Sequence, residues 1–247
     1  MKKLAICVPT YNRAKLLERL LQSIPTISDI VVSICDDGSQ DNTYQIIQNH
    51  KSRISINYTY QNNRGRASAL RKSILNCKAE FFMLVDSDDY FEKDGIETIY
   101  NFIKKNSSTN FFVFPTRIKK NFTSTDVSLS SIPKTSYISL RSDYNLKHDL
   151  QEVIHYGLLI NILYEDPLNI RRIPTSYLWF KASDISKCLP VDTLPVKTKE
   201  YLNDGMTANI LSLKVRYPEY MVLKYKIASQ SKDYKSIFYR FKYKILF

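Results

Sequence analysis

Residues 81–89 read FFMLVDSDD, so five apolar side chains run directly into an acidic cluster. A short apolar run that ends in turn-forming residues is typical of a strand buried inside a sheet. If the strand geometry continues to its end, Asp86 and Asp88 point the same way and their carboxylates converge on one point. Hard divalent cations such as Mg²⁺ bind one or two carboxylates and leave their other positions to water and phosphate oxygens. The segment therefore predicts a strand that ends in a metal site.

The residues before this segment alternate between strand-like and helical patterns. Short apolar runs cover residues 4–8, 30–35 and 54–60, and helical patterns stand between them. Because these runs are nearly continuous in apolar residues, they favour parallel strands that helices cover on both faces. We therefore expect an α/β fold of the Rossmann-like type, with a mostly parallel central sheet. Ligands of such sheets bind outside the carboxyl ends of the strands.

The second half of the chain has a less regular pattern. It predicts a strand at 111–114, a Ser/Thr-rich loop at 123–139, a helix at 143–164 and a late strand at 220–227. We expect one continuous domain over residues 1–231, with halves at 1–105 and 106–231, followed by a basic aromatic tail over 232–247.

The chain is strongly basic, since 36 Lys and Arg residues against 24 Asp and Glu residues give a net charge of +12. Such an excess favours polyanionic partners, namely nucleic acid, an anionic membrane surface or phosphorylated substrates. No run approaches the roughly 18 apolar residues of a membrane-spanning helix, and residues 4–8 are too few for a signal peptide. These features predict a cytoplasmic protein. The four cysteines form no C-x-x-C pair and predict neither a disulfide nor a zinc site.

Polar clusters follow three of the predicted strands. They comprise residues 9–12 after the first strand, 36–41 after the second and 86–89 after the fourth. Each cluster alone is typical of a capped turn, because Asp, Gly and Ser are common in loops and at helix N-termini. Since the carboxyl ends of parallel strands meet at one edge of a sheet, the three clusters together predict a binding site there.

Four sequence blocks, including these clusters, follow one another over about the first 105 residues. They read Pro9-x-Tyr11-Asn12, Asp36-Asp37-Gly38-Ser39-x-Asp41, Asn63-x-Gly65-x-x-x-Ala69 and Asp86-Ser87-Asp88-Asp89. In order and spacing the blocks resemble the successive signatures of the family 2 inverting glycosyltransferases, which have the GT-A fold. The resemblance implies that a sugar moves from a nucleotide diphosphate donor, with a UDP-sugar expected, to an acceptor hydroxyl. It also implies Mn²⁺ or Mg²⁺ as the cofactor.

The resemblance implies a role for each matching position. The donor nucleotide is expected to bind at Thr10, Tyr11, Asp36, Asp37, Asn63, Gly65, Arg71 and Asp86. Within this set Asp37, or alternatively Asp36, would accept a hydrogen bond from a uracil-type ring N–H. Asp88 is expected to bind the metal, while Asp86 contacts the ribose or donor sugar and contributes to the metal site. Arg71 departs from the family pattern, in which the arginine directly follows the alanine, because Leu70 intervenes.

The general base is expected late in the chain. Asn203-Asp204-Gly205-Met206 precedes a periodic apolar segment and resembles the family's Glu-Asp block, so Asp204 is the candidate that deprotonates the acceptor hydroxyl. Glu200 is the alternative base, on the same helical face if the segment is a helix, and Asp192 is a third choice. The competing interpretation of Asp204 is a helix N-cap. Trp179 is a candidate for stacking on the acceptor sugar, with a buried structural role as the alternative.

Two other classes of protein remain as alternatives. A sugar-phosphate nucleotidyltransferase has the same type of sheet but usually begins with a Gly-rich loop, and residues 8–20 contain no glycine. A basic nucleic-acid-binding protein would explain the charge but not the acidic clusters at strand ends, which repel phosphates without a metal. We therefore expect a polysaccharide- or glycan-assembling enzyme with a glycan or lipid-linked acceptor and no nucleic-acid partner. The Q-x-x-R-W signature of processive synthases is absent, which favours the addition of a single sugar.

The tail over 232–247 interleaves basic and aromatic residues. As a helix it would place Tyr234, Phe238, Phe241 and Ile245 on one face. A basic amphipathic segment rich in aromatic residues suits a membrane interface, so one interpretation is peripheral contact with the inner face of an anionic cell membrane. The alternative is a terminal helix packed on the domain. The sequence leaves the oligomeric state open.

Overall fold

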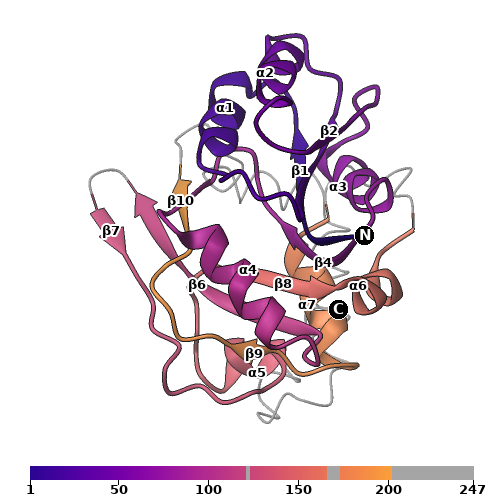
Figure 1. The fold of residues 1–247 in the computed structure, drawn as a ribbon. Coiled ribbons are helices and arrows are strands. Elements are labelled where there is room, and N and C mark those ends of the chain that lie inside the picture. Colours follow the sequence, from indigo (N-terminus) through magenta and orange to yellow (C-terminus); the bar gives the residue numbers. More distant parts are fainter. Residues whose placement is uncertain (121–122, 166–172, 202–247) are drawn as a thin grey trace, which may run out of the picture.

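The computed structural model describes residues 1–120, 123–165 and 173–201, whose strands form a ten-stranded sheet (Figure 1). The strands are β1 (Lys2–Thr10), β2 (Ile30–Asp36), β3 (Ile56–Tyr60), β4 (Ala79–Leu84), β5 (Tyr90–Phe91), β6 (Phe111–Lys120), β7 (Thr123–Thr125), β8 (Leu150–His155), β9 (Leu189–Pro190) and β10 (Lys197–Tyr201). The helices are α1 (Ala14–Gln22), α2 (Thr43–His50), α3 (Arg66–Leu75), α4 (Gly95–Lys105), α5 (Tyr137–Ser142), α6 (Tyr156–Ile162) and α7 (Thr175–Ser183).

The strands are arranged across the sheet in the order β3-β2-β1-β4-β8-β6-β10-β5, and β7 and β9 pair with β6. Strand β1 runs parallel to both β2 and β4, with Thr10 beside Asp36 and Cys7 beside Leu84. Strand β8 is antiparallel to its neighbours β4 and β6, whereas β10 is parallel to β6. The sheet is therefore mostly parallel, and the predicted α/β fold is confirmed.

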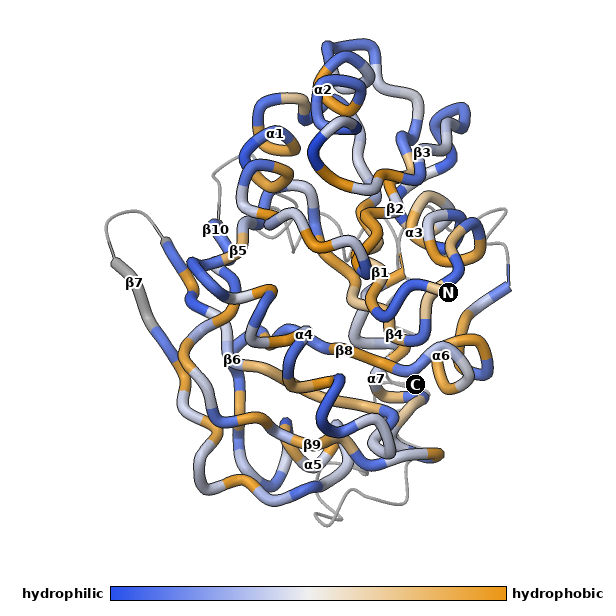
Figure 2. The backbone as a smooth tube through the Cα atoms, in the orientation of Figure 1, coloured by the Kyte–Doolittle hydropathy of each residue, from blue (hydrophilic) through white to orange (hydrophobic). Residues whose placement is uncertain are grey.

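Helices cover both faces of the sheet because the central strands are apolar on both faces. In β1, Ala5 and Cys7 belong to a core with α3, α5, α6 and α7, while Leu4, Ile6 and Val8 belong to a core with α1, α2 and α4. Figure 2 shows hydrophobic residues running through β1 and β2. Burial on both faces accounts for the continuous apolar runs in the sequence.

The helix predicted over 143–164 is wrong. This stretch contains strand β8 and helix α6, while α5 ends just before it at Ser142. Strand β8 pairs with β4 and β6, and these long-range backbone hydrogen bonds override the local helical spacing of apolar residues. The loop predicted over 123–139 likewise holds β7 and the start of α5.

Two sequence predictions concern residues outside the described part of the chain, namely the strand at 220–227 and the tail at 232–247. A membrane-crossing helix is absent from residues 1–120, 123–165 and 173–201, where every helix is too short or too polar.

Helix α4 begins at a close backbone contact. A Cβ atom at Gly95 would lie 2.1 Å from the carbonyl oxygen of Val196, far inside the contact distance of two such atoms. The missing side chain therefore lets the start of α4 lie directly against the residue that precedes β10. The amide of Glu92 also donates to the Val196 carbonyl, at 3.1 Å. This contact fixes the position of β10 relative to the segment that follows β4.

Candidate active site

The polar clusters that follow β1 and β2 are joined by hydrogen bonds. The amide of Asp37 donates to the Thr10 carbonyl at 2.8 Å, and the Asn12 amide donates to the Ser39 hydroxyl at 2.9 Å. The Ala14 amide, at the start of α1, donates to the Asp41 carboxylate at 3.0 Å. The third cluster follows β4, the other strand that pairs with β1. The chain thus gathers all three clusters at the carboxyl ends of adjacent strands.

Asp37 holds the loop that leads into α3. Its carboxylate accepts hydrogen bonds from the Gln61 side chain at 2.7 Å and from the backbone amides of Arg64 and Gly65, each at 2.8 Å. A carboxylate offers about four acceptor positions, so three of these are used within the protein. The side chain is buried, with 4% of its surface exposed. The sequence assigned Asp37 to the nucleotide base, and the structure adds this loop-holding role.

Asp36 closes the turn after β2. One carboxylate oxygen accepts from the Ser39 amide at 2.8 Å, and the other lies 3.3 Å from the Tyr58 hydroxyl. Burial and the Asp36 carboxylate together raise the pKa of the Tyr58 hydroxyl, which therefore stays protonated and acts as the donor. Both carboxylates of this cluster are thus oriented by donors from neighbouring elements.

Two residues of the first cluster differ sharply in exposure. Thr10 is buried, and its hydroxyl oxygen has no hydrogen-bond partner among the residues described. The Tyr11 ring is 45% exposed beside it. A buried polar atom without a partner is costly in a folded protein. The exposed Tyr11 ring offers a surface for a planar ligand, whereas the Thr10 hydroxyl lies beneath that surface.

Arg66 contacts Asp86, which the sequence did not predict. Its guanidinium donates to one Asp86 carboxylate oxygen through Nε at 2.9 Å and Nη2 at 2.5 Å. Burial opposes ionisation of Asp86, but the positive charges of Arg66 and Lys199 outweigh it and hold the pKa of this carboxyl well below its usual range. Arg71, the arginine predicted to contact the diphosphate, instead donates to the Tyr164 carbonyl at 3.1 Å.

The only sequence signal for Arg66 was its place directly after Gly65. This glycine has a φ of 95°, a conformation that side chains disfavour, and it forms the N-cap of α3. Asn63 lies two residues earlier in the same loop, with its backbone amide close to Gly38. The turn therefore sets the first residue of α3, Arg66, opposite the end of β4.

Asp88 is the carboxylate of this site whose negative charge the neighbouring residues stabilise least. Burial, followed by the negative charges of Asp86 and Asp89, raises the pKa of Asp88 to about 6. Asp89 is held by a buried ion pair with Lys197 at 2.6 Å, and its other oxygen has no partner within the described residues. A cation near Asp88 would offset the mutual repulsion of these carboxylates.

The donor set at Asp86 and Asp88 fits a hard divalent cation. Both offer carboxylate oxygens, and Mg²⁺ commonly takes one or two carboxylates with water and phosphate oxygens as its remaining ligands. A cluster of three or more His, Cys, Asp or Glu side chains placed to bind a metal is absent from the described ranges. Among the described residues, Asp86 and Asp88 are therefore the candidate ligands of such a cation.

Arg19 on α1 joins the acidic cluster to β10. Its guanidinium donates to the Asp88 carbonyl at 2.6 Å and to the Glu200 carboxylate at 2.5 Å, and it lies 4.6 Å from the centre of the Tyr90 ring. Lys119 adds a second cation 3.4 Å from Glu200. Glu200 lies in strand β10 and not in a helix. Its hydrogen bond with Arg19 lowers the pKa of this carboxyl, which makes it a weak proton acceptor.

Three further candidates from the sequence remain, at positions 179, 192 and 204. Trp179 is 1% exposed and packs 5.6 Å from the Phe111 ring, so most of its surface belongs to the core. Asp192 is exposed. Asp204, the predicted general base, lies outside the described residues.

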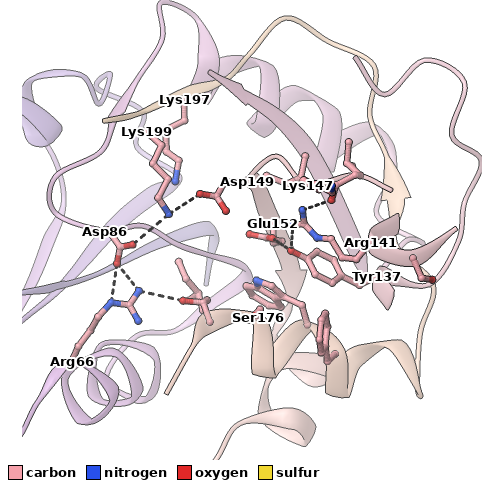
Figure 3. Close-up of a pocket in the computed structure, with 17 residues that line it drawn as sticks. Arg66, Asp86, Tyr137, Arg141, Lys147, Asp149, Glu152, Ser176, Lys197 and Lys199 are labelled. Carbon is pink, nitrogen blue, oxygen red and sulfur yellow. Dashed lines mark hydrogen bonds and ion pairs between the residues drawn. The ribbon is translucent and has the colours of Figure 1, made fainter. Parts of the chain in front are cut away.

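A cavity of about 380 Å³ opens beside Asp86 (Figure 3). Its walls come from the end of β4, from α5 and α7, and from strands β8 and β10. Trp179 and Arg66 both line it. The cavity therefore connects the acidic cluster with the second half of the chain.

Comparison with known proteins identifies the family. The family model described as Glycosyl transferase family 2 matches residues 5–161. Chondroitin synthase of Escherichia coli is 35% identical over 107 residues, which are 42% of this chain and 16% of that protein. The poly(ribitol-phosphate) beta-N-acetylglucosaminyltransferase TarP of Staphylococcus aureus is 33% identical over 115 residues, 44% of this chain and 35% of that protein. The chain thus aligns with well under half the length of these relatives.

Solved structures resemble the chain over most of its length. S. aureus TarS 1–349 in complex with UDP-GlcNAc matches with a TM-score of 0.72 and 19% identity, covering 92% of this chain and 66% of that one. The mannosyltransferase PcManGT of Pyrobaculum calidifontis, in complex with GDP-Man and Mn²⁺, matches with a TM-score of 0.65 and 17% identity, covering 94% and 65%. These likenesses show the GT-A fold. Because the family model spans more than half of the residues, including the clusters after β1, β2 and β4, the chain belongs to glycosyl transferase family 2.

Proposed function

We propose that the chain is a metal-dependent, inverting glycosyltransferase that moves a sugar from a nucleotide diphosphate donor, a UDP-sugar, to an acceptor hydroxyl. The observation that carries this proposal is the position of Asp86 and Asp88 at the end of β4, beside the clusters that follow β1 and β2. The relatives support it, since TarS was solved with UDP-GlcNAc and PcManGT with GDP-Man and Mn²⁺. The acceptor is a glycan or a lipid-linked saccharide.

Different residues are assigned to donor binding, metal binding and proton transfer in such a reaction. Thr10 and Tyr11 form the surface for the nucleotide base, while Asp37 holds the loop before α3 that shapes its edge. Asp86 and Asp88 hold Mn²⁺ or Mg²⁺, which when bound neutralises charge on the departing diphosphate. Asp204 takes the proton of the acceptor hydroxyl, so that the oxygen attacks the sugar from the side opposite the diphosphate.

The two halves of the proposed domain have separate tasks. Residues 1–105 form the donor side, because they hold all three polar clusters. Residues 106–231 form the acceptor side, because they supply most of the walls of the cavity and hold Asp204. Single-sugar addition is part of the proposal, because the sequence lacks the Q-x-x-R-W signature of processive synthases.

Metal-dependent nucleotide binding tests this function directly. We expect UDP to bind in Mn²⁺ at least about tenfold more tightly than in EDTA, because a divalent cation held by Asp86 and Asp88 would neutralise charge on the diphosphate. Isothermal titration of the unmodified protein gives both affinities, and a panel of nucleotide sugars, followed by metal-dependent hydrolysis, identifies the donor. Equal UDP affinity with and without metal would contradict the proposal and favour the nucleic-acid-binding alternative.

A second experiment tests the link that Arg19 makes between α1 and the acidic cluster. Arg19→Met keeps the apolar stem but removes both hydrogen bonds, so the Asp88 backbone loses an anchor. We expect UDP affinity in Mn²⁺ to fall about three- to tenfold with little change in EDTA, and stability to fall by about 1 kcal/mol. Arg19→Lys should restore part of the loss.

Arg53→Met is the matched control for this experiment. The Arg53 guanidinium also donates to two carbonyls near the end of α1, those of Ile24 and Leu21, but it has no contact with the acidic cluster among the described residues. It should lower the free energy of unfolding by a similar amount without a metal-specific effect on UDP. A parallel loss of UDP affinity in both variants would show that Arg19 acts only through general stability.

A further inference from the structure

The cavity beside Asp86 has the size of a small-ligand site. Its volume of about 380 Å³ lies within the range of roughly 300–1,000 Å³ that such sites occupy. Polar and apolar side chains both line it, and the apolar ones include Leu146 and Trp179, which are themselves almost fully buried.

Positive charge dominates the walls of the cavity. Its cationic side chains are Arg66, Arg141, Lys147, Lys197 and Lys199, and its carboxylates are Asp86, Asp149 and Glu152. Three of the cations already contact carboxylates. These contacts are Arg66 with Asp86 at 2.5 Å, Lys199 with Asp149 at 3.4 Å and Lys197 with Asp89 at 2.6 Å. Arg141 and Lys147 are the other two cations of the lining.

Arg141 is held rigidly by neutral acceptors. Its guanidinium donates to the carbonyls of Leu146 at 2.8 Å and His148 at 2.5 Å, and to the Tyr137 hydroxyl at 2.5 Å. It forms no ion pair with a carboxylate within the described ranges, so its charge is fixed in place without being cancelled by contact. Figure 3 shows Arg141 beside Tyr137, with Lys147 on the same side of the cavity.

The Glu152 carboxylate is engaged by Tyr137 and forms no ion pair within the described residues. It accepts a hydrogen bond from the Tyr137 hydroxyl at 2.5 Å, and burial raises the pKa of this carboxyl. Lys147 is exposed at the edge of the cavity. The cavity therefore combines a fixed guanidinium, suited to a planar or tetrahedral oxyanion, with a mobile ammonium.

We propose that this cavity binds an acceptor saccharide that carries an anionic group, with Arg141 and Lys147 facing that group. The anion is a uronate carboxylate or a sugar phosphate, which share the oxygen acceptors that the two cations require. The net charge of +12 also supports an anionic acceptor, since it favours anionic partners for the chain as a whole. The proposal rests on the proposed function, because it assigns the cavity to the acceptor of that reaction.

Two matched pairs of small probes test this proposal and separate the sources of the anion. Methyl β-glucuronide is compared with methyl β-glucoside, and ribitol 5-phosphate with ribitol, in titrations of the full chain saturated with UDP and Mn²⁺. We expect at least one anionic probe to bind about tenfold more tightly than its neutral partner, with a preference that shrinks as salt is added. The preferred pair identifies the anion as carboxylate or phosphate.

Three variants locate the effect. Lys147→Gln should reduce the preference for the anionic probe about three- to fivefold, and Arg141→Gln should remove it. Lys51→Gln removes an equally exposed lysine that does not line the cavity, so it should leave the preference unchanged. If Arg141→Gln fails to fold, Arg141→Lys, which keeps the charge but loses the forked geometry, replaces it.

The titration of UDP on the same preparations separates the two proposals. If UDP binds in a metal-dependent way but anionic and neutral probes bind equally, the cavity proposal is overturned and the proposed function stands. A preference that is undiminished in both Lys147→Gln and the Arg141 variant also overturns it, because the anion then binds elsewhere. If UDP does not bind, both proposals fail together.

Discussion

Replacement of Asp88 by alanine is expected to abolish sugar transfer and to weaken UDP binding in Mn²⁺ far more than in EDTA. Asp88 is the carboxylate that has the least compensation from protein donors, and burial and its acidic neighbours already raise its pKa to about 6. If Asp88 holds the metal as proposed, its loss removes the cation that would neutralise the leaving diphosphate, an effect of about several kcal/mol. Transfer should therefore fall by about three orders of magnitude or more. Initial rates with the identified donor and paired UDP titrations measure both effects.

A matched pair of amide variants controls for the loss of charge and shape. Asp88→Asn keeps the size of the side chain, and Asp94→Asn makes the same change at an exposed carboxylate six residues later. Asp94 has a φ of 60°, which asparagine also adopts readily, so this control adds little strain. Metal-dependent UDP binding that persists in Asp88→Asn would move the metal site away from the end of β4.

The second large effect is expected at the general base. Asp204→Asn keeps the shape and much of the hydrogen bonding of the side chain but cannot accept a proton at neutral pH. A positioned general base contributes about 10²–10⁴-fold, so transfer should fall by that factor. UDP affinity should be nearly unchanged, because the carboxylate acts on the acceptor and in the transition state.

Glu200→Gln, measured beside Asp204→Asn, separates the two candidate bases. The Glu200 carboxylate is engaged by Arg19 and Lys119, so its loss should reduce transfer far less than the loss of Asp204. Near-normal transfer by Asp204→Asn with an inactive Glu200→Gln would assign the base to Glu200. Since asparagine caps a helix about as well as aspartate, full activity of Asp204→Asn alone would reduce Asp204 to a cap. Activity in both variants would leave the inverting mechanism without a proton acceptor here.

The elements that carry the donor side could be predicted because their signals are local. Strands β1, β2 and β4 are short apolar runs, and each polar cluster follows its strand directly, so spacing along the chain gives position in the sheet. Asp36, Asp37 and Asp86 therefore lie at the predicted strand ends. The pairing of β1 with both β2 and β4 then brings these ends together.

The partners of these carboxylates could not be predicted, because they depend on contacts between distant segments. Two arginines on α3 lie five residues apart, and only the packing of that helix decides that Arg66 contacts Asp86 while Arg71 turns to Tyr164. Strand β8 had the spacing of a helix, and its pairing with β4 and β6 is a tertiary effect. The lining of the cavity could not be predicted for the same reason, since Glu152 belongs to β8.

The contact between Gly95 and Val196 limits which residues position 95 can accept. Gly95 is buried at the start of α4, and even one methyl group there would displace the backbone that leads into β10. Lys197 and Lys199 would move with this backbone. The proposed nucleotide surface lies at the ends of β1 and β2, which β4, β8 and β6 separate from β10 in the sheet, so it should stay in place. In a random library at position 95, we therefore expect loss of sugar transfer to be separable from loss of nucleotide binding. Clones that no longer transfer sugar would still be retained on an immobilised nucleotide.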